Sequence, residues 1–154
     1  MPAALVPELF RRSVVSLEAQ EHIMIERPTT KGLLHTPTFA QVLVATGART
    51  VYTSGQVSID EEGKLIGPGD LAAQTTQAMN NLGLALEAAG ATFADIVKTT
   101  TFVVGYRPEL RTLITDAKKP FWAGKPPTSA LIGVAALALP EWLIEIEAVA
   151  VLDG

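Results

Sequence analysis

Two glutamates, Glu145 and Glu147, lie two positions apart in the segment LIEIEAVAVL, whose other residues are all apolar. Because side chains alternate across a β-strand, both carboxylates are expected on the same face. A buried carboxylate needs a cation, several hydrogen-bond donors or a cleft that holds water. Two interpretations stay open: at least one glutamate lines a cleft between subunits and moves protons, or they form interface salt bridges with Lys98, Arg49 or Arg111.

A second group of polar side chains lies in KPPTSALIGV, residues 125–134, where two prolines precede the hydroxyls of Thr128 and Ser129. A nucleophilic serine needs a neighbouring base. Neither His22 nor His35 is expected to lie close enough to Ser129 to act as that base, and no G-x-S-x-G motif surrounds this serine. We therefore do not expect a catalytic serine.

The composition excludes several classes of site. The chain has 16 acidic and 12 basic residues, a net charge of −4, and no dense run of Lys or Arg, which disfavours nucleic-acid binding. It has no cysteine, so disulfides, a thiol nucleophile and a thiolate metal site are excluded, and two histidines do not indicate zinc. No apolar run reaches the roughly 18 residues of a membrane span. No basic region precedes the apolar N-terminal residues, so we expect a cytoplasmic protein without a membrane partner.

The hydrophobic pattern predicts one α+β domain over residues 21–154, preceded by an extension over residues 1–20 with a weak helical pattern. The predicted order is β-β-β-α-β-α-β-β. The strands are expected at 22–27, 40–47, 50–60, 95–104, 129–137 and 142–151, and the helices at 70–89 and 107–119. A tight turn at 47–49 is expected to join the second and third strands, and the two helices to cover one face of a mixed sheet.

The last two predicted strands are apolar on both faces, so both faces must be covered. Two helices cover only one face, and a bare apolar sheet face is more than a monomer normally exposes. Copies of the same chain are the simplest cover, and we therefore predict a homo-oligomer. The alternative is that residues 1–20 fold over that face, but twenty residues are a small lid for a whole sheet.

Three segments resemble the YjgF/RidA/L-PSP (Rid) family: YTSGQVSID, the long run LAAQTTQAMNNLGLALEAAGATFADIVKTTTFVV, and IGVAALALPEWLIEIEAVAVL. The resemblance covers about residues 22–152 without large gaps. It implies a chorismate-mutase-like α+β fold, assembled as a trimer whose sheets form a central barrel with ligand clefts between subunits. It also implies hydrolysis of enamines and imines to 2-keto acids and ammonia, without a metal or organic cofactor. The family's water-handling glutamate corresponds to Glu145.

The same alignment predicts departures inside the cleft. The family's arginine, which grips the substrate carboxylate through paired hydrogen bonds, is replaced here by Ser129, which cannot make that clamp. Phe39 stands where a tyrosine is usual and Ile114 where an asparagine is usual. The Pro-Pro segment would form the rim of this cleft. These changes predict a ligand that is less charged or more apolar than the usual one.

We therefore predict a homotrimer with three intersubunit small-molecule clefts, in which Glu145 is the catalytic residue. The substrate-binding residues are expected to be Phe39, Ser54, Gly55, Gln56, Ile114, Trp122, Thr128 and Ser129. Two functions remain open, an enamine or imine deaminase-type hydrolase with an altered substrate range, and a non-catalytic binding or sensor module for a small carbonyl metabolite. Nuclease activity, which has been described for some members of the family, has little support from a chain of net charge −4.

Overall fold

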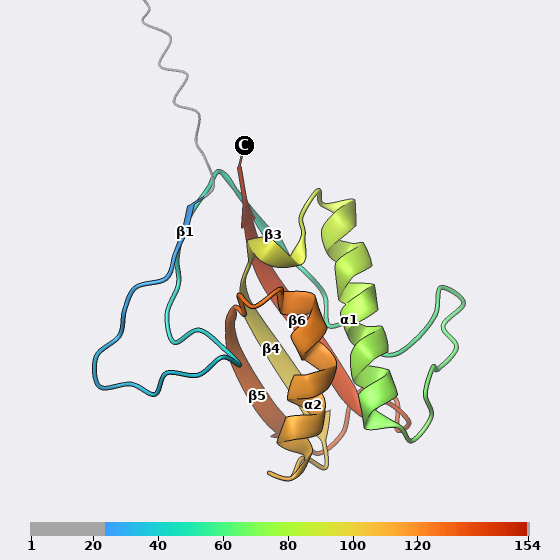
Figure 1. The fold of residues 1–154 in the computed structure, drawn as a ribbon. Helices are drawn as coiled ribbons and strands as arrows, with labels where there is room; N and C mark the ends of the chain where they lie inside the picture. Colours follow the sequence, from blue (N-terminus) through green and yellow to red (C-terminus); the bar gives the residue numbers. More distant parts are fainter. Residues whose placement is uncertain (1–23, 154) are drawn as a thin grey trace, which may run out of the picture.

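The computed structural model describes residues 24–153, so the predicted extension over residues 1–20 lies outside the described residues (Figure 1). The elements are β1 (Met24–Glu26), β2 (Val44–Thr46), β3 (Arg49–Tyr52), α1 (Leu71–Ala88), the 3₁₀ turn η1 (Phe93–Asp95), β4 (Ile96–Val104), α2 (Leu110–Lys118), the 3₁₀ turn η2 (Lys119–Trp122), β5 (Thr128–Val134) and β6 (Ile144–Leu152). The predicted order of strands and helices is confirmed.

The main sheet has the strand order β3-β6-β4-β5. β6 pairs antiparallel with β3 and β4, whereas β4 and β5 run parallel. The parallel pair is connected through α2, and α1 packs against both α2 and β6. Figure 1 shows both helices on the same face of this sheet. The predicted mixed sheet with helices on one face is confirmed.

The predicted turn at 47–49 does not join two paired strands. β2 pairs with β1 in a small separate ribbon, while β3 pairs with β6 in the main sheet. The chain leaves the ribbon at Gly47, where a Cβ would lie 2.6 Å from the carbonyl oxygen of Leu152. Because this close approach to β6 leaves no room for a side chain, the glycine marks a crossing between sheets and not a hairpin turn.

Helix α1 begins and ends as its sequence predicts, whereas α2 is shorter than expected. The Asp70 carboxylate accepts a hydrogen bond from the Ala73 amide at the start of α1, and Gly90 follows its end with φ of 75°. In α2, Pro108 lies before the first helical residue, and Pro120 lies inside η2, which continues the chain beyond α2 as a 3₁₀ turn. This turn carries Trp122 back toward the sheet.

The two faces of the sheet differ strongly in burial. The β6 side chains at even positions from Ile144 to Leu152 are buried under the helices, and they join Met79, Leu82 and Leu86 of α1 in the core. The side chains at odd positions, from Glu145 to Val151, are only half-buried on the opposite face. Neighbouring strands add large apolar side chains to that open face, including Tyr52, which is 77% exposed. No described residue covers it.

Two amides on α1, the buried Gln74 and the half-buried Asn81, attach the loop that follows β3 to the helix. Gln74 donates to the carbonyls of Gly67 and Glu141 (both 3.1 Å) and accepts from the Leu143 amide at 2.9 Å. Asn81 donates to the carbonyls at 57 and 59, each at 2.8 Å. Gln74 thus also joins the helix to the segment before β6, and Asn81 holds the residues that follow the SGQ segment.

Replacing Gln74 with leucine is expected to lower the free energy of unfolding by about 2–4 kcal/mol, because two carbonyls and one N–H lose their partner at a fully buried position. Urea unfolding at one fixed protein concentration measures the change. The control is Thr76→Ala on the exposed side of α1, which should stay within about 0.5 kcal/mol of the parent chain. A loss below about 1 kcal/mol for the leucine variant would mean that the amide is not needed.

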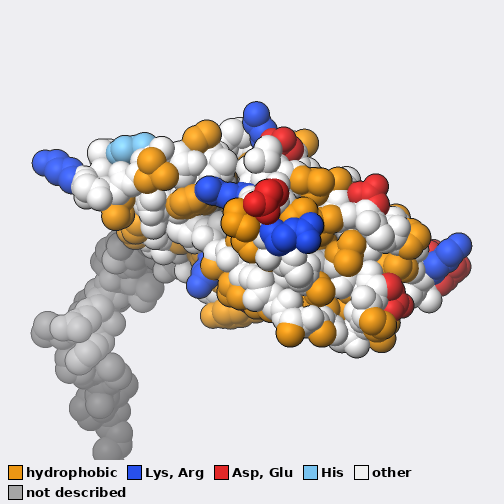
Figure 2. Space-filling view, turned by 90° about the horizontal axis from the view of Figure 1, so that it is seen from below, with side chains coloured by type: hydrophobic (Ala, Val, Ile, Leu, Met, Phe, Trp, Pro, Cys, Tyr) orange, Lys and Arg blue, Asp and Glu red, His pale blue; other side chains and the backbone are white. Residues whose placement is uncertain are grey.

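The charged side chains show no segregation on the face drawn in Figure 2. Lys and Arg side chains alternate there with Asp and Glu, and hydrophobic side chains lie between them. Binding to the phosphate backbone of a nucleic acid favours basic side chains that form a continuous patch or stripe on the surface. This face therefore has no basic patch for a nucleic acid, in agreement with the net charge of −4.

Candidate functional site

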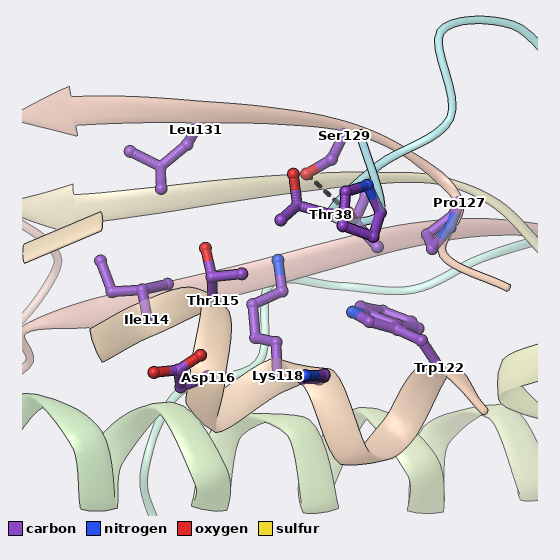
Figure 3. A pocket seen from close by; sticks show the side chains of 12 residues that line it. Thr38, Ile114, Thr115, Asp116, Lys118, Trp122, Pro127, Ser129 and Leu131 are labelled. Atoms are coloured by element: carbon purple, nitrogen blue, oxygen red, sulfur yellow. Dashed lines mark hydrogen bonds between the residues drawn. The ribbon is translucent and has the colours of Figure 1, made fainter. Parts of the chain in front are cut away.

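A cavity of about 190 Å³ lies between α2 and the edge strand β5. It is lined by Pro37, Thr38, Thr99, Ile114, Thr115, Asp116, Lys118, Lys119, Trp122, Pro127, Ser129 and Leu131. Figure 3 shows that the helix side chains and the strand side chains point toward one another across this space. We call it the α2 cavity.

Three of the side chains that the sequence predicts for ligand binding meet in the α2 cavity. Ser129 contributes a hydroxyl that lies 3.2 Å from the Thr99 hydroxyl on β4 (Figure 3). Ile114 is almost fully buried, and Trp122 packs edge-on against Phe93 with ring centroids 5.9 Å apart. The cavity thus combines a pair of hydroxyls with a mainly apolar wall.

Two other predicted residues are neighbours of the cavity without lining it. Thr128 precedes Ser129 on β5, so its side chain points to the opposite face, and its hydroxyl donates to the Val97 carbonyl at 2.6 Å. Phe39 follows Thr38 in the loop after β1, which is joined to the Pro-Pro segment by the hydrogen bond from the Ala40 amide to the carbonyl at 127. This bond supports the prediction that the prolines form a rim.

The structure adds a residue that the sequence analysis missed. Lys118 lies in the last turn of α2, is 8% exposed, and donates from Nζ to the Thr101 hydroxyl at 2.8 Å. Burial lowers the pKa of its ammonium from 10.5 to about 8. The signal was present in the sequence, because Lys118 follows the buried Ile114 by four positions and so shares its helix face.

The remaining predicted residues form a second group, where residues 53–56 run beside β6. Residues 53–56 continue β3 alongside β6, with Gln56 and Ile146 exchanging both backbone hydrogen bonds (2.8 and 2.9 Å). The carboxylate of Glu145 lies directly over Gly55, where a Cβ would collide with it. Glu145 and the SGQ segment, which are 90 positions apart in the chain, are therefore in contact.

Glu147 lies apart from that contact. It lines a smaller hollow of about 160 Å³ on the open face, together with Lys98 and Tyr52. The two glutamates therefore share a face of β6 but have different surroundings. Of the two, only Glu145 has its carboxylate in contact with a backbone segment, at Gly55.

The two groups of predicted residues cannot meet within one chain. Ser129 pairs in register with Thr99, whose side chain is buried on the helix-covered face, and Glu145 lies on the open face. The strand register also offsets them, because Thr99 pairs with Ala148 whereas Glu145 pairs with Phe102. In a single chain the two groups, which we call candidate half-sites, thus lie on opposite faces of the sheet.

The part of the chain that the structure describes contains neither a metal-binding cluster nor a membrane-spanning helix. No group of three or more His, Asp or Glu side chains is placed to hold a metal ion within residues 24–153. Over the same residues, no helix has the length and apolar character that crossing a membrane would need.

Comparison with known proteins identifies the family. The sequence profile of the family described as Endoribonuclease L-PSP matches residues 33–152. The chain belongs to this family. A curated family member, the rat protein named 2-iminobutanoate/2-iminopropanoate deaminase, is 39% identical over 103 residues, which are 67% of this chain and 73% of the rat chain.

Solved structures of the family agree with the fold. YyfB from Yersinia pestis, described as a Rid-family protein of unknown function, is 37% identical with a TM-score of 0.78, over 83% of this chain and 98% of that one. TdcF from E. coli, solved with bound serine, is 27% identical with a TM-score of 0.59, over 79% of this chain and 98% of that one. The predicted Rid fold, with a mixed sheet and two helices on one face, is confirmed.

Proposed function

We propose that this protein hydrolyses the C=N bond of small imines or enamines, releasing ammonia and a 2-oxo acid, with a substrate range that Ser129 has altered. The observation that carries the proposal is the contact between the Glu145 carboxylate and Gly55, because it holds a carboxylate against a backbone segment. Family membership with relatives named as imine deaminases supports the reaction class.

The proposal includes a homotrimer in which each cleft lies at a seam between two copies. One copy would supply the α2 cavity with Ser129, and its neighbour would supply Glu145 with the SGQ segment. Two features support this arrangement: the open sheet face carries exposed apolar side chains such as Tyr52, and the two half-sites lie on opposite faces of one chain.

In the proposed reaction, Glu145 orients a water molecule and accepts its proton as the oxygen attacks the imine carbon. Addition to the protonated imine gives a carbinolamine, and Glu145 returns the proton to its nitrogen. Ammonia then leaves as the carbinolamine hydroxyl gives its proton to Glu145 and the C=O bond forms. No cofactor is required, because the reaction adds water and expels ammonia without a change of oxidation state. The carboxylate needs only a fixed position, which the adjoining backbone of residues 54–56 provides.

The test is the release of ammonia and 2-oxo acid from 2-iminobutanoate and 2-iminopropanoate, each generated in situ from the amino acid by an amino acid oxidase. We expect a rate above that of buffer, with a different preference between substrates from that of a family member that carries the arginine. No rate above buffer with any imino acid would reject the hydrolase. Binding of the 2-oxo acids without turnover would instead support a sensor of small carbonyl metabolites.

Replacing Gly55 with alanine is expected to lower kcat about 10- to 100-fold while changing the free energy of unfolding by less than about 1 kcal/mol. The three atoms nearest to the added Cβ all belong to the flexible Glu145 side chain, from Cγ to the carboxylate, so this side chain can move aside but the carboxylate then leaves its position. Ammonia release and urea unfolding measure the two quantities. Gly63→Ala, in an exposed turn, is the control for kcat. An unchanged kcat for Gly55→Ala would mean that this contact has no role in the reaction.

A further inference from the structure

Lys118 is a buried lysine whose ammonium lies 5.8 Å from the centroid of the Trp122 ring and borders a cavity. Its ammonium is buried at the C-terminal end of α2 and faces the α2 cavity, and Figure 3 shows its Nζ pointing away from the helix toward the strands. An ammonium has three N–H donors, and among the described residues only the Thr101 hydroxyl accepts from it, at 2.8 Å. Donors therefore remain for a ligand.

The surroundings of this ammonium attract a negative charge. Burial is the cause that lowers its pKa, and no carboxylate pairs with it in the described part of the chain. The other ionisable side chains that line the cavity are Asp116 and Lys119 on α2 and η2, since the lining residues from β4, β5 and the loop at 37–38 carry no charge. An anion placed beside Nζ would offset the cost of burying the cation.

The rest of the cavity defines the size and polarity of that anion. The hydroxyls of Thr99 and Ser129 lie at one wall, 3.2 Å apart, and can donate to carboxylate oxygens. Ile114, Leu131 and Trp122 provide apolar surface. A volume of about 190 Å³ is below the ~300–1,000 Å³ of pockets for drug-sized ligands, so the occupant is small.

We propose that Lys118 holds the carboxylate of the ligand in the α2 cavity, together with the hydroxyls of Thr99 and Ser129, and that the ligand carries an apolar side chain. The positive charge then comes from α2, across the cavity from the β5 position that Ser129 occupies. Under the proposed function, on which this assignment of substrate rests, the substrates are 2-imino acids with apolar side chains, such as the one derived from leucine.

The test measures binding of a ligand that does not react, 4-methyl-2-oxopentanoate, to the purified full-length chain by isothermal titration calorimetry. Lys118→Met keeps the length of the apolar stem and removes the buried charge, so the variant is expected to fold. We expect it to weaken binding at pH 7 at least about tenfold. Lys64→Met, which removes a lysine from an exposed turn, should leave the affinity unchanged. An unchanged affinity in Lys118→Met overturns the proposal.

Two further measurements separate a charge effect from a loss of packing. The double variant Lys118→Met/Ser129→Arg returns a cation to the cavity from β5 and should recover most of the lost affinity. In the parent chain, affinity should fall as pH rises above about 8, because the ligand stays anionic while the ammonium loses its proton. This pH dependence should be absent in Lys118→Met. Failure of both the recovery and the pH dependence overturns the proposal.

The outcomes also distinguish this inference from the proposed function. Binding that depends on Lys118, with no ammonia released from any imino acid, supports the carboxylate site and rejects the hydrolase. Ammonia release that Lys118→Met leaves unchanged supports the hydrolase and rejects the role of the lysine. Reduction with borohydride in the presence of the oxo acid should leave the protein mass unchanged. A covalent adduct on Lys118 would reject the ionic role in favour of a Schiff base.

Discussion

Replacing Glu145 with glutamine is expected to lower the rate of imine hydrolysis about 10²–10⁴-fold, because the amide keeps the shape of the side chain but cannot accept the proton of the attacking water. The free energy of unfolding should hardly change. The side chain is only half-buried, and it contacts the backbone at Gly55 without a hydrogen bond to any described residue. Ammonia release from imino acids generated in situ measures the rate.

The chain offers a matched control for this substitution. Glu147→Gln removes the same charge from the same face of β6, but Glu147 lies in the hollow with Lys98 and not against the SGQ segment. Its rate should stay within about threefold of the parent chain. If both variants lost activity equally, a general effect of charge on the open face would account for the loss. If neither lost activity, Glu145 would not be the residue that handles water.

The parts of the fold that local sequence patterns specify could be predicted. Helix α1 has apolar residues at helical spacing, a capping aspartate at 70 and a glycine at 90 that ends it. β4 and β6 have long runs of β-branched or alternating apolar residues, and their ends agree with prediction within two residues. These signals lie within one element, so no knowledge of its neighbours is required.

Pairing between distant elements could not be predicted from such patterns. The strands around Gly47 are separated by two residues, which favours a hairpin, but each has a better partner elsewhere, β1 for β2 and β6 for β3. The close approach of Gly47 to Leu152 depends on residues 105 positions apart. No local pattern carries that information.

The candidate site, like the fold, could be predicted only in part from the sequence. The sequence analysis predicted that Ser129, Ile114 and Trp122 belong to one cleft, the first two from the alignment of motifs, and all three line one cavity. Lys118 was missed because a lysine near a helix end is usually solvated and interacts favourably with the helix dipole. Its spacing of four from Ile114 was a signal for the inner face of the helix, but only the structure shows the hydrogen bond to Thr101 on β4. The alignment also could not indicate that the predicted residues occupy both faces of the sheet.

Replacing Tyr52 with glutamate is expected to convert the proposed trimer to single chains and to abolish the proposed activity. Tyr52 lies on the open face beside Glu147 and is 77% exposed in one chain, so the substitution removes no packing from the chain's own core. In the trimer this face would be buried against the other copies, where a new carboxylate near an existing one opposes association. Analytical ultracentrifugation should give three times the 16.3 kDa chain mass for the parent protein and the single mass for the variant.

A matched substitution on the opposite side of the molecule tests whether assembly is the cause. Leu84 is 65% exposed on α1, which lies on the helix-covered face, and Leu84→Glu should leave both the trimer and the rate of ammonia release unchanged. Loss of activity on dissociation follows from the two half-sites, because a single chain holds its α2 cavity and its Glu145 on opposite faces of the sheet. A Tyr52→Glu variant that sediments as a single chain and still hydrolyses imines would show that one chain suffices. The proposed seam between copies would then have no part in the reaction.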